Sequence, residues 1–142
     1  MPENEVFPCS PRMELEGIIY LPRMLEKIRL MHAGTLHPDL HANLGRAMDL
    51  WTCQFLGVEY QELQAQVIAG ATDENVLCWA REHGITRPDF ELAWFNSHLR
   101  NFGYRDAMSE RLEERKKEAP HTDRADILSF IDYIEVDEGR TI

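Results

Sequence analysis

The 142-residue sequence has little of what marks several familiar protein classes. Its cysteines are Cys9, Cys53 and Cys78, an odd number without a C-x-x-C pair, which argues against a secreted disulfide framework and fits a reducing cytosol. No apolar run approaches the roughly 20 residues that span a bilayer, and the acidic start lacks the apolar stretch of a signal peptide. We therefore expect a cytoplasmic protein that does not cross a membrane.

Positive charge is also scarce. The sequence carries 25 acidic and 15 basic side chains, for a formal net charge of -10. A field of this sign repels phosphate backbones and anionic lipid surfaces, so we expect neither nucleic acid nor membrane as a partner. The hydrophobic share of 44% is nevertheless enough to fill the core of one domain of this length.

Signals for β-structure are weak, because no alternating run of β-branched residues and no Asn-Gly or Asp-Gly turn occurs. Apolar residues recur instead at the helical period, in segments that end at glycine or proline. The pattern predicts an all-α protein, a compact single-domain bundle of about six or seven short helices over residues 17–142, after an extended N-terminal arm over residues 1–16. The helices are expected at 22–33, 46–56, 60–69, 73–83, 88–102 and 106–118, with the last one starting near 122.

The inward faces of these helices can be read from the same period. Met31, Phe90, Trp94 and Leu128 are expected to contribute to the core, together with the regularly spaced leucines and isoleucines. Trp94 and Phe95 are adjacent and point about 100° apart on a helix. One of the two rings is therefore a candidate to cover a second surface, such as a dimer contact.

Several short strings occur along the chain in a fixed order. They are 17–23 (GIIYLPR), 27–29 (KIR), 33–36 (AGTL), 55–58 (FLGV), 70–74 (GATDE), 103–106 (GYRD), 123–126 (DRAD) and 137–140 (DEGR). With these strings the sequence resembles a family of small bacterial proteins that is classed as a domain of unknown function. The resemblance covers about residues 9 to 140. It implies a bacterial, cytosolic origin and brings no reaction or cofactor with it.

Three histidines, His32, His37 and His41, invite a metal interpretation, with Asp39 or Asp49 as a carboxylate ligand. The spacing does not favour it, because the proline after His37 disfavours the helical conformation that would align two of these rings. No H-E-x-x-H motif or cysteine pair completes a site. We predict no metal and no cofactor.

A set of basic residues offers a second hypothesis. Arg23 and Lys27 lie one helical turn apart, and the two cations repel each other unless anions lie between them. Buried pairs with the chain's own carboxylates are the favoured interpretation, and a pocket for a phosphate or carboxylate of a small anionic metabolite is the alternative. The candidate anion- or ligand-binding residues are Arg23, Lys27, Arg29, His41, Asp49, Arg105, Asp106 and Arg124.

No catalytic motif accompanies these charges. The sequence has no G-x-S-x-G turn and no glycine-rich phosphate loop, and Cys53, between two aromatic residues, has the setting of a core residue. We predict a non-catalytic helical binding or interaction protein, with a homodimer as one form. The alternative is a small enzyme or sensor with an anionic metabolite in an arginine-lined pocket, where His41 or Asp49 would transfer protons.

Overall fold

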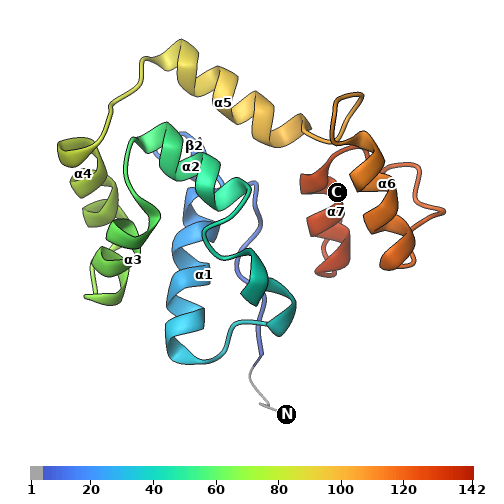
Figure 1. The fold of residues 1–142 in the computed structure, drawn as a ribbon, viewed down its shortest axis with the longest axis horizontal. Coiled ribbons are helices and arrows are strands. Elements are labelled where there is room, and N and C mark those ends of the chain that lie inside the picture. Colours follow the sequence, from blue (N-terminus) through green and yellow to red (C-terminus); the bar gives the residue numbers. More distant parts are fainter. Residues whose placement is uncertain (1–4) are drawn as a thin grey trace. The chain divides into compact units, whose positions relative to one another are not determined.

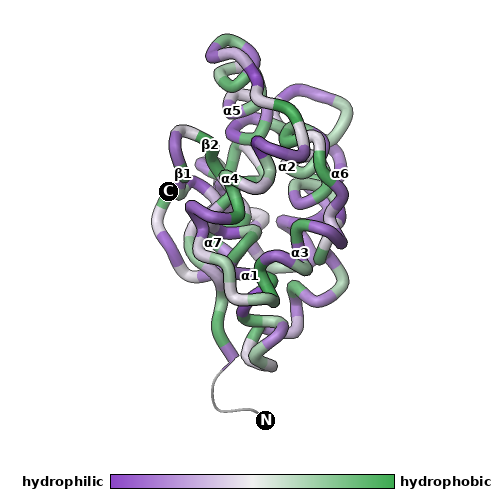
Figure 2. Tube along the Cα trace, turned by 90° about the vertical axis from the view of Figure 1, so that its left-hand side faces the viewer, coloured by the Kyte–Doolittle hydropathy of each residue, from purple (hydrophilic) through white to green (hydrophobic). Residues whose placement is uncertain are grey.

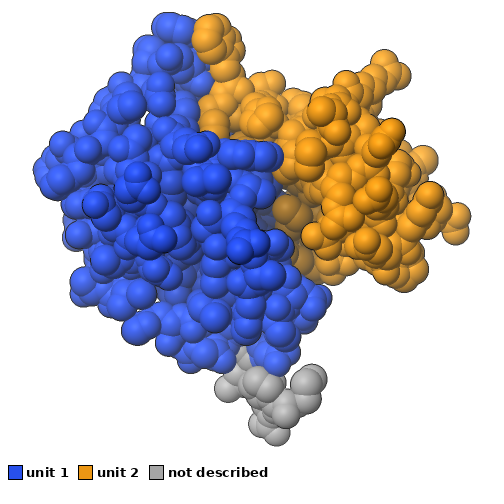
Figure 3. Space-filling model, in the orientation of Figure 1, with its two compact units in different colours: residues 1–92 blue, residues 93–142 orange. Residues whose placement is uncertain are grey.

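The computed structural model describes residues 5–142, and the chain divides into two compact units, residues 1–92 and 93–142 (Figures 1 and 3). Helices make up most of the described chain, which has seven α-helices, one 3₁₀ helix and a two-stranded sheet. The predicted all-α class is confirmed. That residues 17–142 unfold as one cooperative domain stays a prediction. None of the described helices is both long and apolar enough to cross a membrane.

A small hairpin opens the first unit. Strand β1 (Glu14–Leu15) pairs antiparallel with β2 (Ile18–Ile19), with Leu15 opposite Ile18. The two linking residues, Glu16 and Gly17, have φ angles of +47° and +83°. Positive φ at both positions is typical of a type I′ turn. The hairpin was not predicted, because its turn pair, Glu16-Gly17, is neither Asn-Gly nor Asp-Gly.

Five helices follow in the first unit; the bounds of the four α-helices agree closely with the prediction, whereas the short 3₁₀ helix was not predicted. They are α1 (Leu21–Ala33), η1 (Pro38–Asn43), α2 (Met48–Leu56), α3 (Tyr60–Ile68) and α4 (Asp73–His83). Helix α3 packs against α1, α2 and α4. The core of the unit consists of apolar side chains from all four α-helices and the hairpin: Ile19, Leu21, Leu25, Ile28, Leu56, Leu63, Val76 and Leu77.

Local chemistry explains where two of these helices begin and end. The Oγ1 atom of Thr72 accepts a hydrogen bond from Asn75 N at 3.2 Å and caps α4. The other end of α4 stops at Gly84, where a Cβ atom would lie 2.1 Å from the carbonyl oxygen of Leu56. Ile85 N then donates to this same oxygen at 2.8 Å. The end of α4 is thereby joined to the end of α2.

The remaining helices are α5 (Asp89–Asn101), which crosses the unit boundary, α6 (Ser109–Glu118) and α7 (Phe130–Asp137). In the second unit α6 packs against α7, around the buried side chains of Leu99, Leu112, Ile127 and Ile131. The rings of Phe102 and Phe130 stack with their centroids 4.8 Å apart.

The predicted start of the last helix is wrong by about eight residues. Helix α7 begins at Phe130, where Ser129 Oγ accepts from Asp132 N at 3.2 Å and caps it. The stretch from 122 therefore does not begin a helix, although the acidic residues there looked like an N-terminal signal. The local ion pair between Arg124 and Asp126 accounts for part of that stretch.

The predicted inward positions are also partly wrong. Met31, Phe90, Trp94 and Leu128 are all exposed, Phe90 by 58% and Trp94 by 68%. Hydrophobic and hydrophilic segments accordingly alternate along the trace in Figure 2. Helical period identifies which residues share a face, and Phe90 and Trp94 do share one on α5. It does not establish that the face is covered.

Candidate functional site

The first unit contains a buried polar cluster, which we call the Lys27–Asp49 cluster. Lys27 Nζ on α1 lies 3.0 and 3.2 Å from the two carboxylate oxygens of Asp49 on α2. Tyr20 Oη donates to Asp49 Oδ1 at 2.5 Å, and Gly45 N donates to Oδ2 at 2.9 Å. Asp49 has no exposed surface, so the salt bridge lies out of water. The cluster thus joins α1 to the beginning of α2.

Two tyrosine hydroxyls and a cysteine thiol near the cluster are held in their protonated forms. Burial, followed by the neighbouring Asp49, raises the pKa of Tyr20 well above its ordinary value. The same two causes, in the same order, raise the pKa of the Cys53 thiol to about 12 and also raise that of Tyr60. At neutral pH these groups remain uncharged, and a thiol with so high a pKa is a poor nucleophile.

The backbone at two positions beside the cluster is strained. Tyr20 has φ +73° and ψ −25°, and Ala47 has φ +50° and ψ −117°; sparsely populated conformations of this kind cost a non-glycine residue about 1–3 kcal/mol each. Tyr20 is the residue before α1, and Ala47 is the residue before α2. Both turns lead directly into the helices that carry Lys27 and Asp49, so the strain is stored where the cluster is assembled.

Of the residues predicted to bind an anion or ligand, Lys27 and Asp49 lie in direct contact. Arg23 is also buried, and its Nη1 donates to the carbonyl oxygen of Cys9 at 3.1 Å. Arg29 pairs with Asp73 at 2.6 Å and links α1 to the start of α4. Exposed His41 has its Nε2 2.8 Å from the carbonyl oxygen of Leu36. Lys27 thus pairs with a carboxylate of the chain itself, the arrangement favoured from the sequence.

The other predicted residues belong to the second unit. Arg105 lies over the ring of Tyr104, 5.2 Å from its centroid. The carboxylate of Asp106 accepts hydrogen bonds from the backbone of Gly103 and Met108, each at 2.8 Å. Arg124 forms two hydrogen bonds with Asp126, at 2.7 and 2.8 Å. Each of the three therefore has a local contact.

Metal-binding groups are not gathered in the described residues. No three histidine, cysteine, aspartate or glutamate side chains of residues 5–142 come close enough to share an ion. His37 stacks on Phe7, with ring centroids 4.3 Å apart, and its Nδ1 accepts from Asp39 N at 3.2 Å. A stacking and turn-forming role accounts for this histidine.

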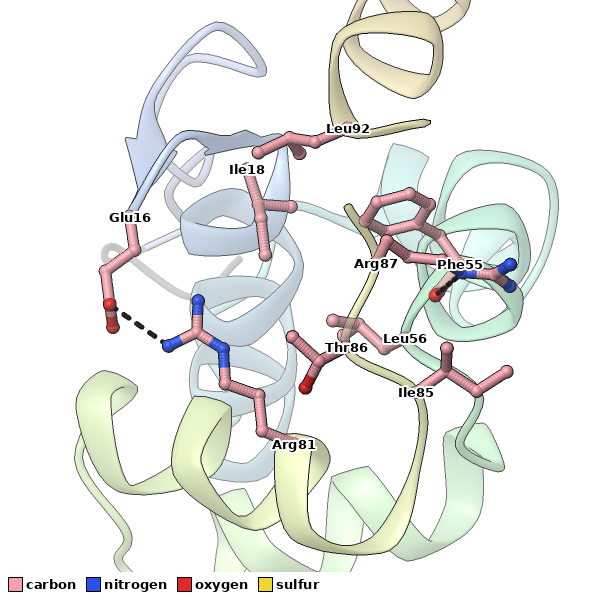
Figure 4. Close-up of a pocket in the computed structure, with 9 residues that line it drawn as sticks. All are labelled: Glu16, Ile18, Phe55, Leu56, Arg81, Ile85, Thr86, Arg87 and Leu92. Atoms are coloured by element: carbon pink, nitrogen blue, oxygen red, sulfur yellow. Dashed lines mark hydrogen bonds and ion pairs between the residues drawn. The ribbon is translucent and has the colours of Figure 1, made fainter. Parts of the chain in front are cut away.

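An open pocket, not predicted from the sequence, lies in the first unit beside the ends of α2 and α4 (Figure 4). Its volume is about 350 Å³, including open solvent. The lining combines apolar side chains with an acid and two arginines: Glu16, Ile18, Phe55, Leu56, Arg81, Ile85, Thr86, Arg87 and Leu92. In Figure 4, Glu16 and Arg81 lie on one side and Phe55 and Arg87 on the other.

The two arginines of the pocket are held differently. Arg87 donates to the carbonyl oxygens of Phe55 at 2.9 Å and Gln54 at 3.3 Å, and its guanidinium lies 5.5 Å from the centre of the Phe55 ring. Arg81 Nη1 instead pairs with Glu16 Oε1 at 3.0 Å, and both side chains are about half exposed. Arg87 therefore fixes a wall of the pocket, whereas the contact of Arg81 is open to water.

No sequence signal connects these groups, because Glu16 and Arg81 are 65 residues apart. Only the packing of α4 next to the hairpin turn makes them neighbours.

Among curated proteins, none matches the sequence. A family model described as a domain of unknown function matches residues 5–140. This match covers nearly the whole chain, and the protein therefore belongs to the DUF5069 family.

Proposed function

We propose that the protein is a non-catalytic binding protein whose first unit holds a small ligand in the open pocket between the hairpin turn, α2 and α4. One observation carries the proposal. The groups best suited to chemistry, in the Lys27–Asp49 cluster, are sealed in the core, whereas the solvent-accessible pocket is suited to binding.

The Lys27–Asp49 cluster is a poor reaction centre. The two carboxylate oxygens of Asp49 receive hydrogen bonds from Lys27, Tyr20 and the backbone of Gly45. Lys27 is 3% and Asp49 0% exposed, so a substrate would have to open the core to reach either group. A general acid or base has to come within hydrogen-bond distance of its substrate. The cluster is better explained as a clamp between two helices.

The pocket has the features of a binding site. Small-molecule sites are typically concave and mostly apolar, with a few polar groups that orient the ligand. Ile18, Leu56, Ile85 and Leu92 provide the apolar surface here, and Arg81 provides an exposed charge. No histidine, cysteine or lysine is among its lining residues. The pocket thus offers contacts and orientation for a ligand.

The alternative, an enzyme or sensor for an anionic metabolite, draws support from Arg81 alone. His41 and Asp49, the residues that would move protons in that hypothesis, do not line the pocket. We also propose a cytoplasmic setting, because Cys9, Cys53 and Cys78 are all free thiols. A bacterial origin is proposed from the family resemblance alone. Homodimer formation is a further proposal, which light scattering during size-exclusion chromatography tests directly.

Binding in the pocket can be tested by titrating the ¹⁵N-labelled protein with small apolar acids, amides and alcohols. We expect the amide resonances of Ile18 and Thr86 to shift, while that of Lys27 stays unchanged. Thr86→Trp should fill the pocket and abolish the shifts. Thr122→Trp introduces the same side chain at an exposed position of the second unit and should have no effect.

Two results would contradict the proposal. Shifts that persist in Thr86→Trp would place binding elsewhere, and a panel without any binder would remove the pocket as a site. Chemical conversion of a bound compound, followed in the same samples by one-dimensional proton spectra, would show that the protein is an enzyme.

A further inference from the structure

The hairpin turn carries an unusual residue at its first central position. A type I′ turn needs a positive φ at both central residues, and asparagine, aspartate and glycine dominate there because they tolerate it best. Gly17 meets this requirement, but the φ of +47° at position 16 belongs to a glutamate. A longer acidic side chain in this conformation costs free energy within the turn. An observed outlier of this kind is a reason to look for a role elsewhere.

The carboxylate of Glu16 reaches the mouth of the pocket. Its Oε1 atom lies 3.0 Å from Nη1 of Arg81, which extends from the last turns of α4 (Figure 4). The Glu16 side chain is 52% exposed and that of Arg81 40% exposed. An ion pair this open to water contributes little to stability and exchanges readily. A stabilising role of this ion pair therefore does not account for the presence of glutamate at the strained position 16.

The other polar groups of the pocket are differently engaged. Arg87 is committed to the two carbonyl oxygens at the end of α2 and to the face of Phe55. Leu56 and Ile18 are buried apolar residues between the two sides of the pocket, and Thr86 adds a hydroxyl group. A ligand in this pocket therefore meets one exchangeable guanidinium beside an apolar surface.

Building on the proposed function, we propose that the pocket takes a small carboxylate with a branched apolar body, and that Glu16 occupies Arg81 as a stand-in for the ligand's carboxylate. Binding exchanges one carboxylate for another on the same guanidinium, whose planar fork matches this group. The apolar body lies against Phe55, Ile85 and Leu92, the more exposed apolar side chains of the lining. A doubly charged phosphate fits less well, because Glu16 remains nearby and the whole chain carries a net charge of -10.

The test uses 3-methylbutanoate and its neutral counterpart 3-methylbutanamide as probes, titrated into the ¹⁵N-labelled full chain. The acid should bind several-fold more tightly than the amide, and Arg81→Gln should remove this difference. Glu16→Asn removes the competing carboxylate and places a preferred residue in the turn. It should raise the affinity for the acid by about 1.5-fold to fivefold, the range expected for loss of an exposed ion pair, and leave the amide unaffected.

A matched control separates local from global charge. Glu114→Asn makes the same substitution at an exposed ion-paired glutamate of α6 in the second unit and should not change the affinity for the acid. Cross-strand contacts between Leu15 and Ile18, measured by nuclear Overhauser effects, check that the hairpin remains folded in Glu16→Asn. Phenyl phosphate, as a third probe, tests the preference for carboxylate over phosphate.

Equal binding of acid and amide would overturn the carboxylate assignment while leaving a binding pocket in place. An unchanged affinity in Glu16→Asn would do the same, as would tighter binding of phenyl phosphate. If none of these probes and no neutral fragment shifted the pocket resonances, the proposed function would fail as well.

Discussion

Removing the charge of Lys27 tests whether the Lys27–Asp49 cluster is a structural clamp. Lys27→Met keeps most of the aliphatic side chain and leaves the carboxylate of Asp49 with only the Tyr20 hydroxyl and the Gly45 amide from its present donors. Both members of the pair are almost completely buried, at 4% and 0% side-chain exposure. Losing one partner of such a pair costs about 3–5 kcal/mol, because the other charge remains uncompensated. This is a large part of the 5–15 kcal/mol that typically stabilises a domain.

The cost should be largely recoverable by neutralising the partner. Asp49→Asn in the Lys27→Met background removes the unbalanced charge and keeps an oxygen that can accept from Tyr20. We expect the double variant to be about 2 kcal/mol more stable than Lys27→Met alone, because the second substitution removes the uncompensated buried charge, which accounts for most of the cost of the first. Urea unfolding followed by circular dichroism at 222 nm gives the four free energies of unfolding at neutral pH.

An exposed pair provides the control for this cycle. Arg124→Gln breaks the ion pair with Asp126, whose two side chains are 43% and 57% exposed, and should leave the unfolding midpoint unchanged. The reasoning would be refuted if Lys27→Met were as harmless as Arg124→Gln. It would also be refuted if Asp49→Asn added its full cost to that of Lys27→Met, since the two charges would then not compensate each other.

Three further predictions concern the same unit. Ala47→Gly should stabilise the protein by about 1 kcal/mol in urea unfolding, because glycine adopts a φ of +50° without the strain of a side chain. Gly84→Ala should lower the free energy of unfolding by about 4 kcal/mol or more, since the new Cβ would lie 2.1 Å from the carbonyl oxygen of Leu56. A strongly reduced melting temperature would show this loss. Ionisation of Cys53 should lower stability at alkaline pH, because its pKa is about 12 in the folded protein against 9.0 as the ordinary value, so the unfolded chain loses the proton first. Between pH 9 and 10 the loss should be about 1 kcal/mol, and this part of the pH dependence should be missing in Cys53→Ala.

The helices of the first unit were predictable because their determinants are local. Gly34 ends α1 with a φ of +77°, and Thr72 caps α4, so both boundaries follow from residues within one turn. The start of α7 was missed for a related reason. The acidic residues at 123 and 126 resemble those of a helix N-terminus. The residue that forms the capping hydrogen bond is Ser129, seven residues after the predicted start.

The sites were less predictable than the helices because they depend on distant contacts. In a chain with a net charge of -10, an acidic partner for Lys27 is expected from the sequence. The identity of that partner depends on how α1 and α2 cross. The pocket is further from prediction, since its charged pair joins the hairpin turn to α4 across 65 residues. Glu16 is a local irregularity of the pocket, because it stands at a turn position that favours asparagine, aspartate or glycine, and its meaning depends on the position of Arg81.

Helix α2 connects the buried cluster to the pocket. Its first turn is held by Asp49, and its last carbonyl oxygens are held by Arg87 and by the amide of Ile85. A helix fixed at both ends can move little, so the pocket wall formed by Phe55 and Leu56 is set before a ligand arrives. The contact between Glu16 of the hairpin turn and α4 is instead an exposed ion pair. A binding site with one rigid wall and one exchangeable contact needs little reorganisation to accept a ligand, which lowers the entropic cost of binding.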